Sequence, residues 1–294
     1  MPLALTDVTL SAVTAINHEL TVRAMVECLK HCSFADVVLV SDKPVKAPFR
    51  VEIMPPFPDG RYYAPFICRN LARYTASPFN LLVQFDSHVV DPGAWSGRFL
   101  EYDYIGAKWP WHPPHRRVGN SGFCLRSKKL LDILAGTLLP PTGQFVDDIF
   151  ICVTIRDWLE RVHGIKIAPE DVADAFSYER HTPLSPTFGV HGLFNFWRHT
   201  SDDEMERIPR LLDDLYVPSR AYVEVLLHYY ASRNMPVFSS LYQRLRDHLG
   251  AEPTQTHLLS YVPDPAYIGE LITTGDGASA ARIGRHAEAL KGRV

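Results

Sequence analysis

Two possible metal ligands, Asp86 and His88, stand two residues apart after an apolar run at residues 81–85. This run is too short to span a membrane and too continuous for a strand with one solvated face, so it predicts a strand buried on both sides of an α/β sheet. Ligands of such sheets collect at the carboxyl ends of the strands. Because carboxylate and imidazole both bind divalent metals, the pair indicates a metal site at this strand end.

Two adjacent carboxylates, Asp147 and Asp148, begin a helix-like segment that continues to Arg161. The helix dipole favours acids in a first turn, so N-terminal capping is one interpretation. The other is catalytic. Neighbouring side chains point in different directions, which lets one acid orient an acceptor hydroxyl while the other removes its proton.

A third candidate, His191, lies in the glycine-containing segment 187–192. Small neighbours let its imidazole approach a metal or a diphosphate closely, although a single histidine more often has a structural role. Neither a GxGxxG motif after the first strand nor a P-loop occurs in the sequence, so a nucleotide diphosphate needs another anchor. A divalent metal at Asp86 is the anchor we expect.

Elements of alternating type position these residues. We expect strands at 3–13, 36–42, 50–54, 81–85 and 103–107 and helices at 17–31, 62–74 and 147–161. This order predicts an α/β fold with a mostly parallel central sheet flanked by helices. Residues 108–117 contain three prolines and two tryptophans, which predicts either a lid over the site or an ordered surface loop whose tryptophans pack on the core.

Composition excludes several classes of protein. The chain has 294 residues, 46% of them hydrophobic, and a formal net charge of -3, which is typical of a globular protein and argues against a nucleic-acid partner. Its five cysteines have no CxxC spacing, which favours buried free thiols over a zinc or disulfide framework. With neither a signal-like start nor a long apolar run, we expect no membrane span and a cytoplasmic location.

Three regions are expected along the chain. Residues 1–200 form the α/β domain with the site, and residues 201–262 form a helical subdomain. Residues 263–294, which end in a basic segment, are predicted to be a C-terminal tail with possible mobility.

Four stretches, in this order, resemble a family of uncharacterised bacterial and fungal domains (DUF5672-like), which is itself similar to GT-A glycosyltransferases. They are DSH at 86–88, YIGA with WP at 104–110, GNSGF with LRS at 119–127, and DD at 147–148 ahead of FGVHG at 188–192. The resemblance covers about residues 17–192. It implies a GT-A-like fold and a nucleotide-sugar-dependent transferase, in which a DxD-like element holds a divalent metal on the diphosphate.

Carried over to this chain, the resemblance gives Asp86 and His88 the places of the two DxD acids, and His191 that of a late metal-binding histidine. A histidine in this set suits Mn²⁺ better than Mg²⁺. Asp147 and Asp148 match the Glu-Asp pair of inverting members, so Asp148 is the implied base and Asp147 the acid that orients the acceptor. The implied donor is a nucleotide sugar, with a UDP-sugar favoured, and the acceptor is a glycan or another hydroxyl-bearing compound.

Other contacts are assigned by position alone. Five residues are candidates for binding the nucleotide sugar: Ser41 and Asp42 for the base or ribose, Arg69 and Lys108 for phosphate, and Asn120 for the donor near its glycine-flanked turn. Trp109 and Trp111 are candidates for stacking on a sugar. Two alternatives stay open, a catalytically silent GT-A-like module that binds a nucleotide or glycan, and a metal hydrolase built from the same acids and histidines.

Overall fold

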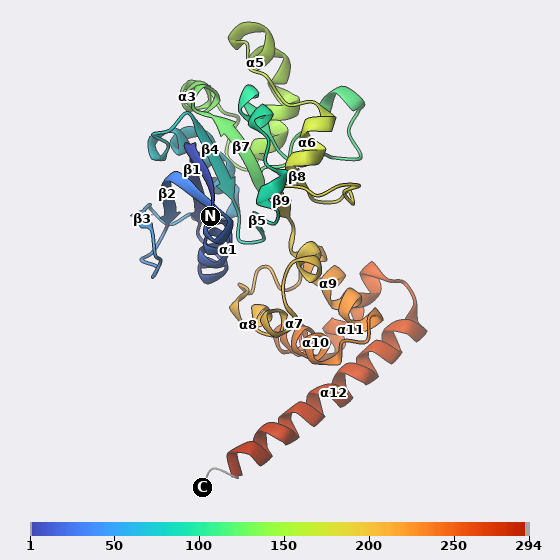
Figure 1. Ribbon diagram of the computed structural model, residues 1–294. Helices are drawn as coiled ribbons and strands as arrows, with labels where there is room; N and C mark the ends of the chain where they lie inside the picture. The colour runs from blue at the N-terminus through green and yellow to red at the C-terminus, as the bar shows by residue number, and fades with distance from the viewer. Residues whose placement is uncertain (1, 292–294) are drawn as a thin grey trace. The chain divides into compact units, whose positions relative to one another are not determined.

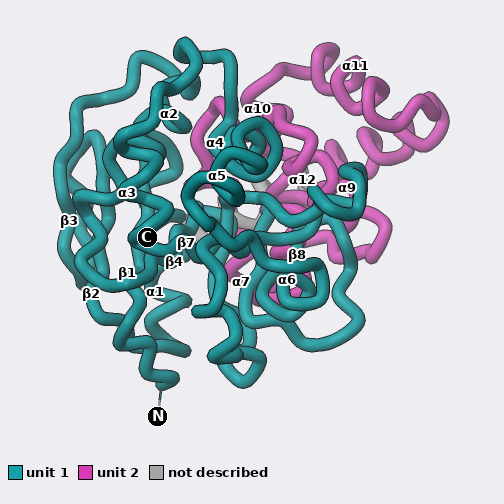
Figure 2. The backbone as a smooth tube through the Cα atoms, turned by 90° about the horizontal axis from the view of Figure 1, so that it is seen from above, with its two compact units in different colours: residues 1–192 teal, residues 193–294 magenta. Residues whose placement is uncertain are grey.

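The computed structural model describes residues 2–291, with side chains described as far as residue 278. The chain divides into two compact units, Met1–Gly192 and Leu193–Val294 (Figure 2). The boundary falls before the expected one at residue 200, because the turn of 3-10 helix Leu193–Arg198 contacts helices of the second unit.

The first unit contains a six-stranded sheet in the order β3-β2-β1-β4-β7-β6 (Figure 1). Its strands are β1 (Leu3–Thr14), β2 (Cys32–Ser41), β3 (Arg50–Ile53), β4 (Phe79–Val83), β6 (Tyr104–Ile105) and β7 (Phe123–Ser127). The first four neighbours in this order pair in parallel, and β7 runs antiparallel to both β4 and β6. The sheet confirms the predicted fold class, an α/β protein with a mostly parallel sheet.

The predicted buried strand at 81–85 corresponds to β4, whose residues Leu81, Leu82 and Val83 are fully buried. It ends at Val83, two residues earlier than expected. The amide of Gln84 turns to donate to the carbonyl of Gly122, at 3.0 Å, and the chain then reverses. This reversal sends the following residues into a separate small sheet.

That small sheet has three short strands in the order β5-β9-β8. They are β5 (Ser87–Val89), β8 (Ser177–Tyr178) and β9 (Gly189–His191). Strands β5 and β9 are antiparallel, with Ser87 opposite His191 and His88 opposite Val190. Segments separated by about a hundred residues in the sequence therefore lie next to each other at the end of β4.

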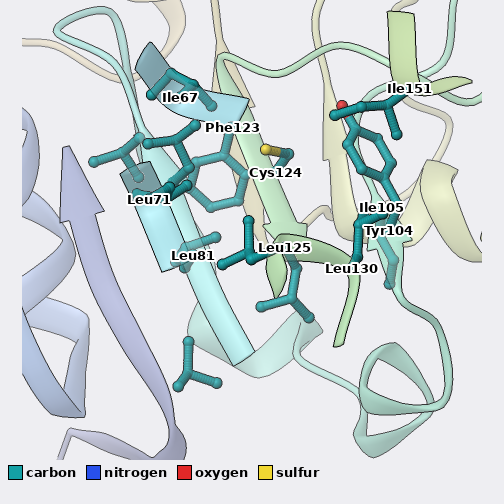
Figure 3. Packing of buried hydrophobic residues seen from close by; sticks show 14 of the residues in the cluster. Ile67, Leu71, Leu81, Tyr104, Ile105, Phe123, Cys124, Leu125, Leu130 and Ile151 are labelled. Atoms are coloured by element: carbon teal, nitrogen blue, oxygen red, sulfur yellow. The ribbon is translucent and has the colours of Figure 1, made fainter. Parts of the chain in front are cut away.

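Helices cover the sheet of the first unit. They are α1 (His18–His31), α2 (Tyr63–Asn70), α3 (Lys128–Gly136), α4 (Asp147–Ile149), α5 (Arg156–His163) and α6 (Glu170–Phe176). Helix α1 contacts β1 and β2, and α3 contacts β7. Figure 3 shows Ile67 of α2, Leu81 of β4 and Phe123 of β7 in one cluster of buried side chains. The five cysteines are free and buried, as expected.

The prediction of one continuous helix over 147–161 is wrong in one respect. A π-helical turn, Phe150–Thr154, separates α4 from α5, and the amide of Ile155 donates to the carbonyl of Phe150 at 2.9 Å. Such a turn inserts one extra residue into the helix, and π-turns are frequent at functional sites. Here the insertion follows the two adjacent acids directly.

The second unit is helical, as the sequence predicts beyond residue 200. Its helices are α7 (Asp202–Met205), α8 (Ile208–Leu211), α9 (Arg220–Ala231), α10 (Met235–Leu249), α11 (Ala251–Tyr261) and α12 (Pro265–Lys291). Helix α12 occupies most of the region expected to be a separate tail, because Ile268 and Leu271 are buried and α12 contacts α10 and α11. Residues 292–294 of that region lie outside the described residues. Across the described chain, α12 included, no helix combines the length and the hydropathy that crossing a membrane requires.

Candidate functional site

The candidate site lies at the carboxyl end of β4. Because β7 runs antiparallel to β4 and begins at Phe123 opposite Val83, the preceding residues 119–122 return to this edge of the sheet. A cavity of about 450 Å³ opens here. It is lined by Gly60, Arg61, Tyr63, Ala64, Gln84, Asn120, Ser121, Gly122, Gly143, Phe145, Val146, Asp147, Asp148 and His191. Four of the predicted site residues are therefore brought together: Asn120, Asp147, Asp148 and His191.

Asp147 is the first residue of α4 and is only 3% exposed. Both of its carboxylate oxygens are engaged. Arg126 donates from Nη2 to Oδ2 at 2.5 Å, and Ser121 donates from Oγ to Oδ1 at 3.1 Å. Arg126 itself is fully buried in β7, with 0% exposure. The inner acid is therefore held from two sides by groups of the protein.

Asp148, the next residue, is half-buried and lines the same cavity. Burial raises its pKa to about 6, and the negative charge of Asp147 acts in the same direction. Hydrogen bonds from the backbone amides of Ile149 and Ser121, with the positive charge of Arg126, offset only part of this rise in pKa. A carboxyl with such a pKa is able to exchange a proton near neutral pH.

Asn120 turns the chain at the cavity wall. Its φ of 59° is left-handed, a conformation that asparagine adopts more readily than most residues. The side-chain oxygen accepts from the amide of Gly122 at 3.2 Å, and the backbone carbonyl accepts from the Tyr104 hydroxyl at 3.2 Å. These bonds set the course of the backbone from Asn120 to Gly122.

His191 packs directly on Gly122. A Cβ added to Gly122 would lie 2.0 Å from His191 Nε2, so only glycine leaves room for the imidazole ring. On one side of the ring Nε2 lies 3.5 Å from Asp86 Oδ1, and on the other Nδ1 lies 3.7 Å from Glu179 Oε1. Burial lowers the pKa of His191, but the charges of Asp86, Glu179 and Asp148 outweigh it, and the net shift is upward.

The three predicted metal ligands are not gathered into one set. Ser87 and His191 face each other across β5 and β9, so the next residue, His88, projects from the opposite face of the ribbon. Within residues 2–278, no group of three or more His, Cys, Asp or Glu side chains is arranged to hold a metal ion. Asp86 Oδ1 and His191 Nε2, 3.5 Å apart, are two donor atoms close enough to share one divalent ion.

Ser41 and Asp42 lie at the end of β2, and neither lines the cavity. Ser41 donates from Oγ to the carbonyl of Lys43 at 2.7 Å. The Asp42 carboxylate lies 2.6 Å from His18 Nε2, at the start of α1. Both predicted nucleotide contacts therefore have local partners in the structure.

Arg69 and Lys108 also lie apart from the cavity lining. Arg69 is exposed on α2. Lys108 donates to Asp174 Oδ2 at 2.7 Å and lies 3.7 Å from Glu170 Oε2, so its ammonium group belongs to a cluster with α6.

The tryptophan-containing loop divides into a buried and an exposed part. Trp109 is 3% exposed and packs on Gly119, as the core-packing interpretation predicts, whereas Trp111 is 62% exposed. The loop is closed at its base by the amide of Trp109, which donates to the carbonyl of Arg117 at 2.7 Å. Trp109 is therefore unavailable for stacking on a ligand.

Sequence reasoning missed Arg126, Ser121 and Arg61. An arginine inside the apolar strand Phe123–Ser127 was the available signal for the first, since an arginine inside a buried strand requires a partner. Ser121 donates to Asp147, but no signal in the sequence distinguished it, because a serine in a glycine-rich turn is common. Arg61 lines the cavity mouth, where Asp59 accepts from its guanidinium at 2.9 and 2.8 Å.

The region that contains the cavity matches a known protein family. Residues 61–191 match the family described as "Protein of unknown function (DUF5672)", which confirms the resemblance seen in the four motifs. The match spans every residue that lines the cavity except Gly60. No curated protein matches the sequence.

Glycosyltransferases occur among the solved structures that match the chain. One is "Mannosyltransferase PcManGT from Pyrobaculum calidifontis in complex with GDP-Man and Mn2+", with a TM-score of 0.41 and 10% identity over 93% of this chain and 87% of the other. Another is a glycosyltransferase involved in glycosylation of the major capsid of PBCV-1, with a TM-score of 0.36 and 12% identity over 63% and 93%. At these identities and TM-scores the likeness transfers no activity to this chain.

Proposed function

We propose that this protein is a glycosyltransferase that moves a sugar from a nucleotide-sugar donor to an acceptor hydroxyl, with inversion at the anomeric carbon. The observation that carries the proposal is the pair of adjacent acids in one cavity. One, Asp147, is held by Arg126 and Ser121, and the other, Asp148, has its pKa raised to about 6. This arrangement supplies a single carboxylate suited to general-base work.

In the proposed reaction, Asp148 accepts the proton of an acceptor hydroxyl. The acceptor oxygen attacks the anomeric carbon from the face opposite the diphosphate, and the bond between that carbon and the diphosphate oxygen breaks. Nucleoside diphosphate leaves, and the new glycosidic bond has the inverted configuration. Asn120, which shares the cavity with Asp148, is the proposed contact for the donor.

Asp86 and His191 would hold a divalent cation beside this cavity, for which an oxygen and a nitrogen donor favour Mn²⁺ over Mg²⁺. Such an ion, when bound, supplies positive charge for the diphosphate leaving group. We leave His88 out of this set, because it projects from the other face of the ribbon. A UDP-sugar is the favoured donor, and the acceptor is a glycan or another hydroxyl-bearing molecule.

The test is a transfer assay with a panel of UDP-, GDP-, CMP- and dTDP-sugars, each with Mn²⁺, Mg²⁺ or chelator. Release of nucleotide is measured together with thermal unfolding. A donor at a hundredfold excess over its dissociation constant stabilises the fold by about 2.7 kcal/mol. We expect one nucleotide class to stabilise the protein only with metal, and Asp86→Ala to abolish that effect.

The variant Asp148→Asn separates transfer from binding. We expect it to keep donor-induced stabilisation and to lose nucleotide release, with Asp132→Asn, an exposed acid on α3, as the matched control. If the wild type binds a donor but releases no nucleotide with any acceptor tested, the result favours the catalytically silent binding module. No stabilisation by any donor would refute the proposed site.

A further inference from the structure

Arg126 is the largest fully buried side chain of the described residues. It lies in β7, a strand whose five residues are all buried, where an unpaired guanidinium is strongly disfavoured. Its Nη2 is bound to Asp147, its Nε donates to Cys124 Sγ at 3.2 Å, and its guanidinium lies 5.4 Å from the centre of the Tyr104 ring. Asp147 is thus the carboxylate that balances this charge.

The pair is connected to Asp148 through Ser121. The Ser121 hydroxyl donates to Asp147, and the Ser121 backbone amide helps to lower the pKa of Asp148. Arg126, Asp147 and Ser121 therefore restrain the start of α4, which carries the carboxylate that faces the cavity. The π-turn that follows at Phe150–Thr154 leaves this start of the helix without a regular α-helical continuation.

Stability alone does not account for such a pair. Replacing a buried ion pair by apolar side chains of similar volume is often neutral or stabilising, since desolvation offsets the attraction between the charges. A fixed direction for the carboxylate is what apolar side chains are unable to supply. Adjacent acids without a positive charge behind them would also repel each other and share their protons.

We propose that Arg126 is a positioning residue, which acts through Asp147 and Ser121 to hold the first turn of α4 so that Asp148 alone presents its carboxylate to the acceptor. The inference rests on the proposed function. It assigns Asp147 to the support of the base rather than to contact with the acceptor. The other titratable groups that act on Asp148 or are acted on by it are His191, Tyr104, Cys124 and Cys152.

The experiment compares Arg126→Lys, Arg126→Met and the double variant Arg126→Met/Asp147→Leu, which exchanges the ion pair for an apolar pair. For the double variant we expect a folded protein with kcat lowered at least about a hundredfold and the KM for the donor within about threefold of wild type. Arg126→Lys keeps the charge and is expected to retain kcat within about tenfold.

A second readout does not depend on turnover. The titration midpoint of Asp148 is followed by carboxyl ¹³C NMR, and we expect Arg126→Met to raise it by about one unit or more, because a neighbouring positive charge is lost. Arg126→Lys is expected to leave it near the wild-type value.

The outcomes separate the two proposals. A double variant with wild-type kcat would overturn the positioning role, and so would one that fails to fold, because the pair would then hold the core. If the wild type transfers no sugar, the proposed function fails. The NMR result then decides alone: a raised midpoint in Arg126→Met supports the positioning of Asp148 by Arg126, and an unchanged midpoint refutes it.

Discussion

Two strand ends of the first unit, those of β2 and β4, look alike in sequence and differ in structure. The second half of β2 and most of β4 are buried, and polar residues stand at the end of β2 and directly after β4. At the end of β2, Asp42 lies 2.6 Å from His18, and Ser41 bonds to the nearby carbonyl of Lys43. At the end of β4, residues from five separate segments surround a cavity of about 450 Å³.

The neighbours of each strand explain this difference. Strand β2 lies between β1 and β3, which are both parallel to it, so the chain leaves all three carboxyl ends toward helices or loops. Strand β4 lies between the parallel β1 and the antiparallel β7, whose entry loop returns to the same edge. The antiparallel β7 thus brings distant segments to this edge. The strand order also reverses between β1 and β4, and such a reversal is where ligands of open α/β sheets bind.

Of the changes proposed for the two strand ends, replacing the proposed base should have the largest effect on turnover. We expect Asp148→Asn to lower turnover about 10²- to 10⁴-fold, the usual contribution of a general base. It should also stabilise the fold. The folded-state pKa of about 6 exceeds the ordinary 3.8, so ionising Asp148 costs stability as pH rises through 6, by about 1 to 3 kcal/mol.

Urea unfolding of both proteins at pH 4 and pH 8 measures this gain. The difference between Asp148→Asn and wild type should be near zero at pH 4 and appear at pH 8. If the variant and the wild type are equally stable at both pH values, the raised pKa of Asp148 is contradicted. If Asp148→Asn keeps full turnover, Asp148 is not the base.

A methyl group at Gly122 should have the next largest effect. Because its Cβ would lie 2.0 Å from His191 Nε2, Gly122→Ala should displace the imidazole and lower turnover about 10- to 100-fold. Gly136→Ala is the matched control, since a Cβ at Gly136 meets no atom within 4 Å. Wild-type turnover in Gly122→Ala would show that His191 is not needed at this place.

The pH dependence of turnover should follow the same carboxyl. A base with a pKa of about 6 is half protonated at that pH, so kcat/KM should fall about tenfold for each unit below it. The profile is measured from pH 4.5 to 8 with the best donor. A flat profile across pH 5 to 7 would exclude Asp148 as the group that accepts the proton.

The smallest effect on turnover is expected at the other strand end. Asp42→Ala removes the bond to His18 and should lower stability by about 1 kcal/mol. Turnover should stay within about threefold of wild type, because Asp42 does not line the cavity. A tenfold or greater rise in the KM for the donor would instead assign Asp42 to the nucleotide and reduce the contrast between the two ends.

The sequence by itself determined the alternation of elements, the buried strand β4, and the place of Asp147 and Asp148 at a helix start. These features depend on residues close together in the chain, because periodicity and helix-dipole preferences are local. The helical nature of the second unit followed in the same way.

Only the tertiary structure decided which polar strand end opens into a cavity, which acid is held by Arg126 and which way His88 points. Arg126 and Asp147 are 21 residues apart, and their pairing depends on β7 lying antiparallel beside β4. His88 and His191 are separated by strand register, since a shift of one residue reverses the face on which a side chain lies. Strand order and register are set by packing across the whole unit, which no local pattern contains.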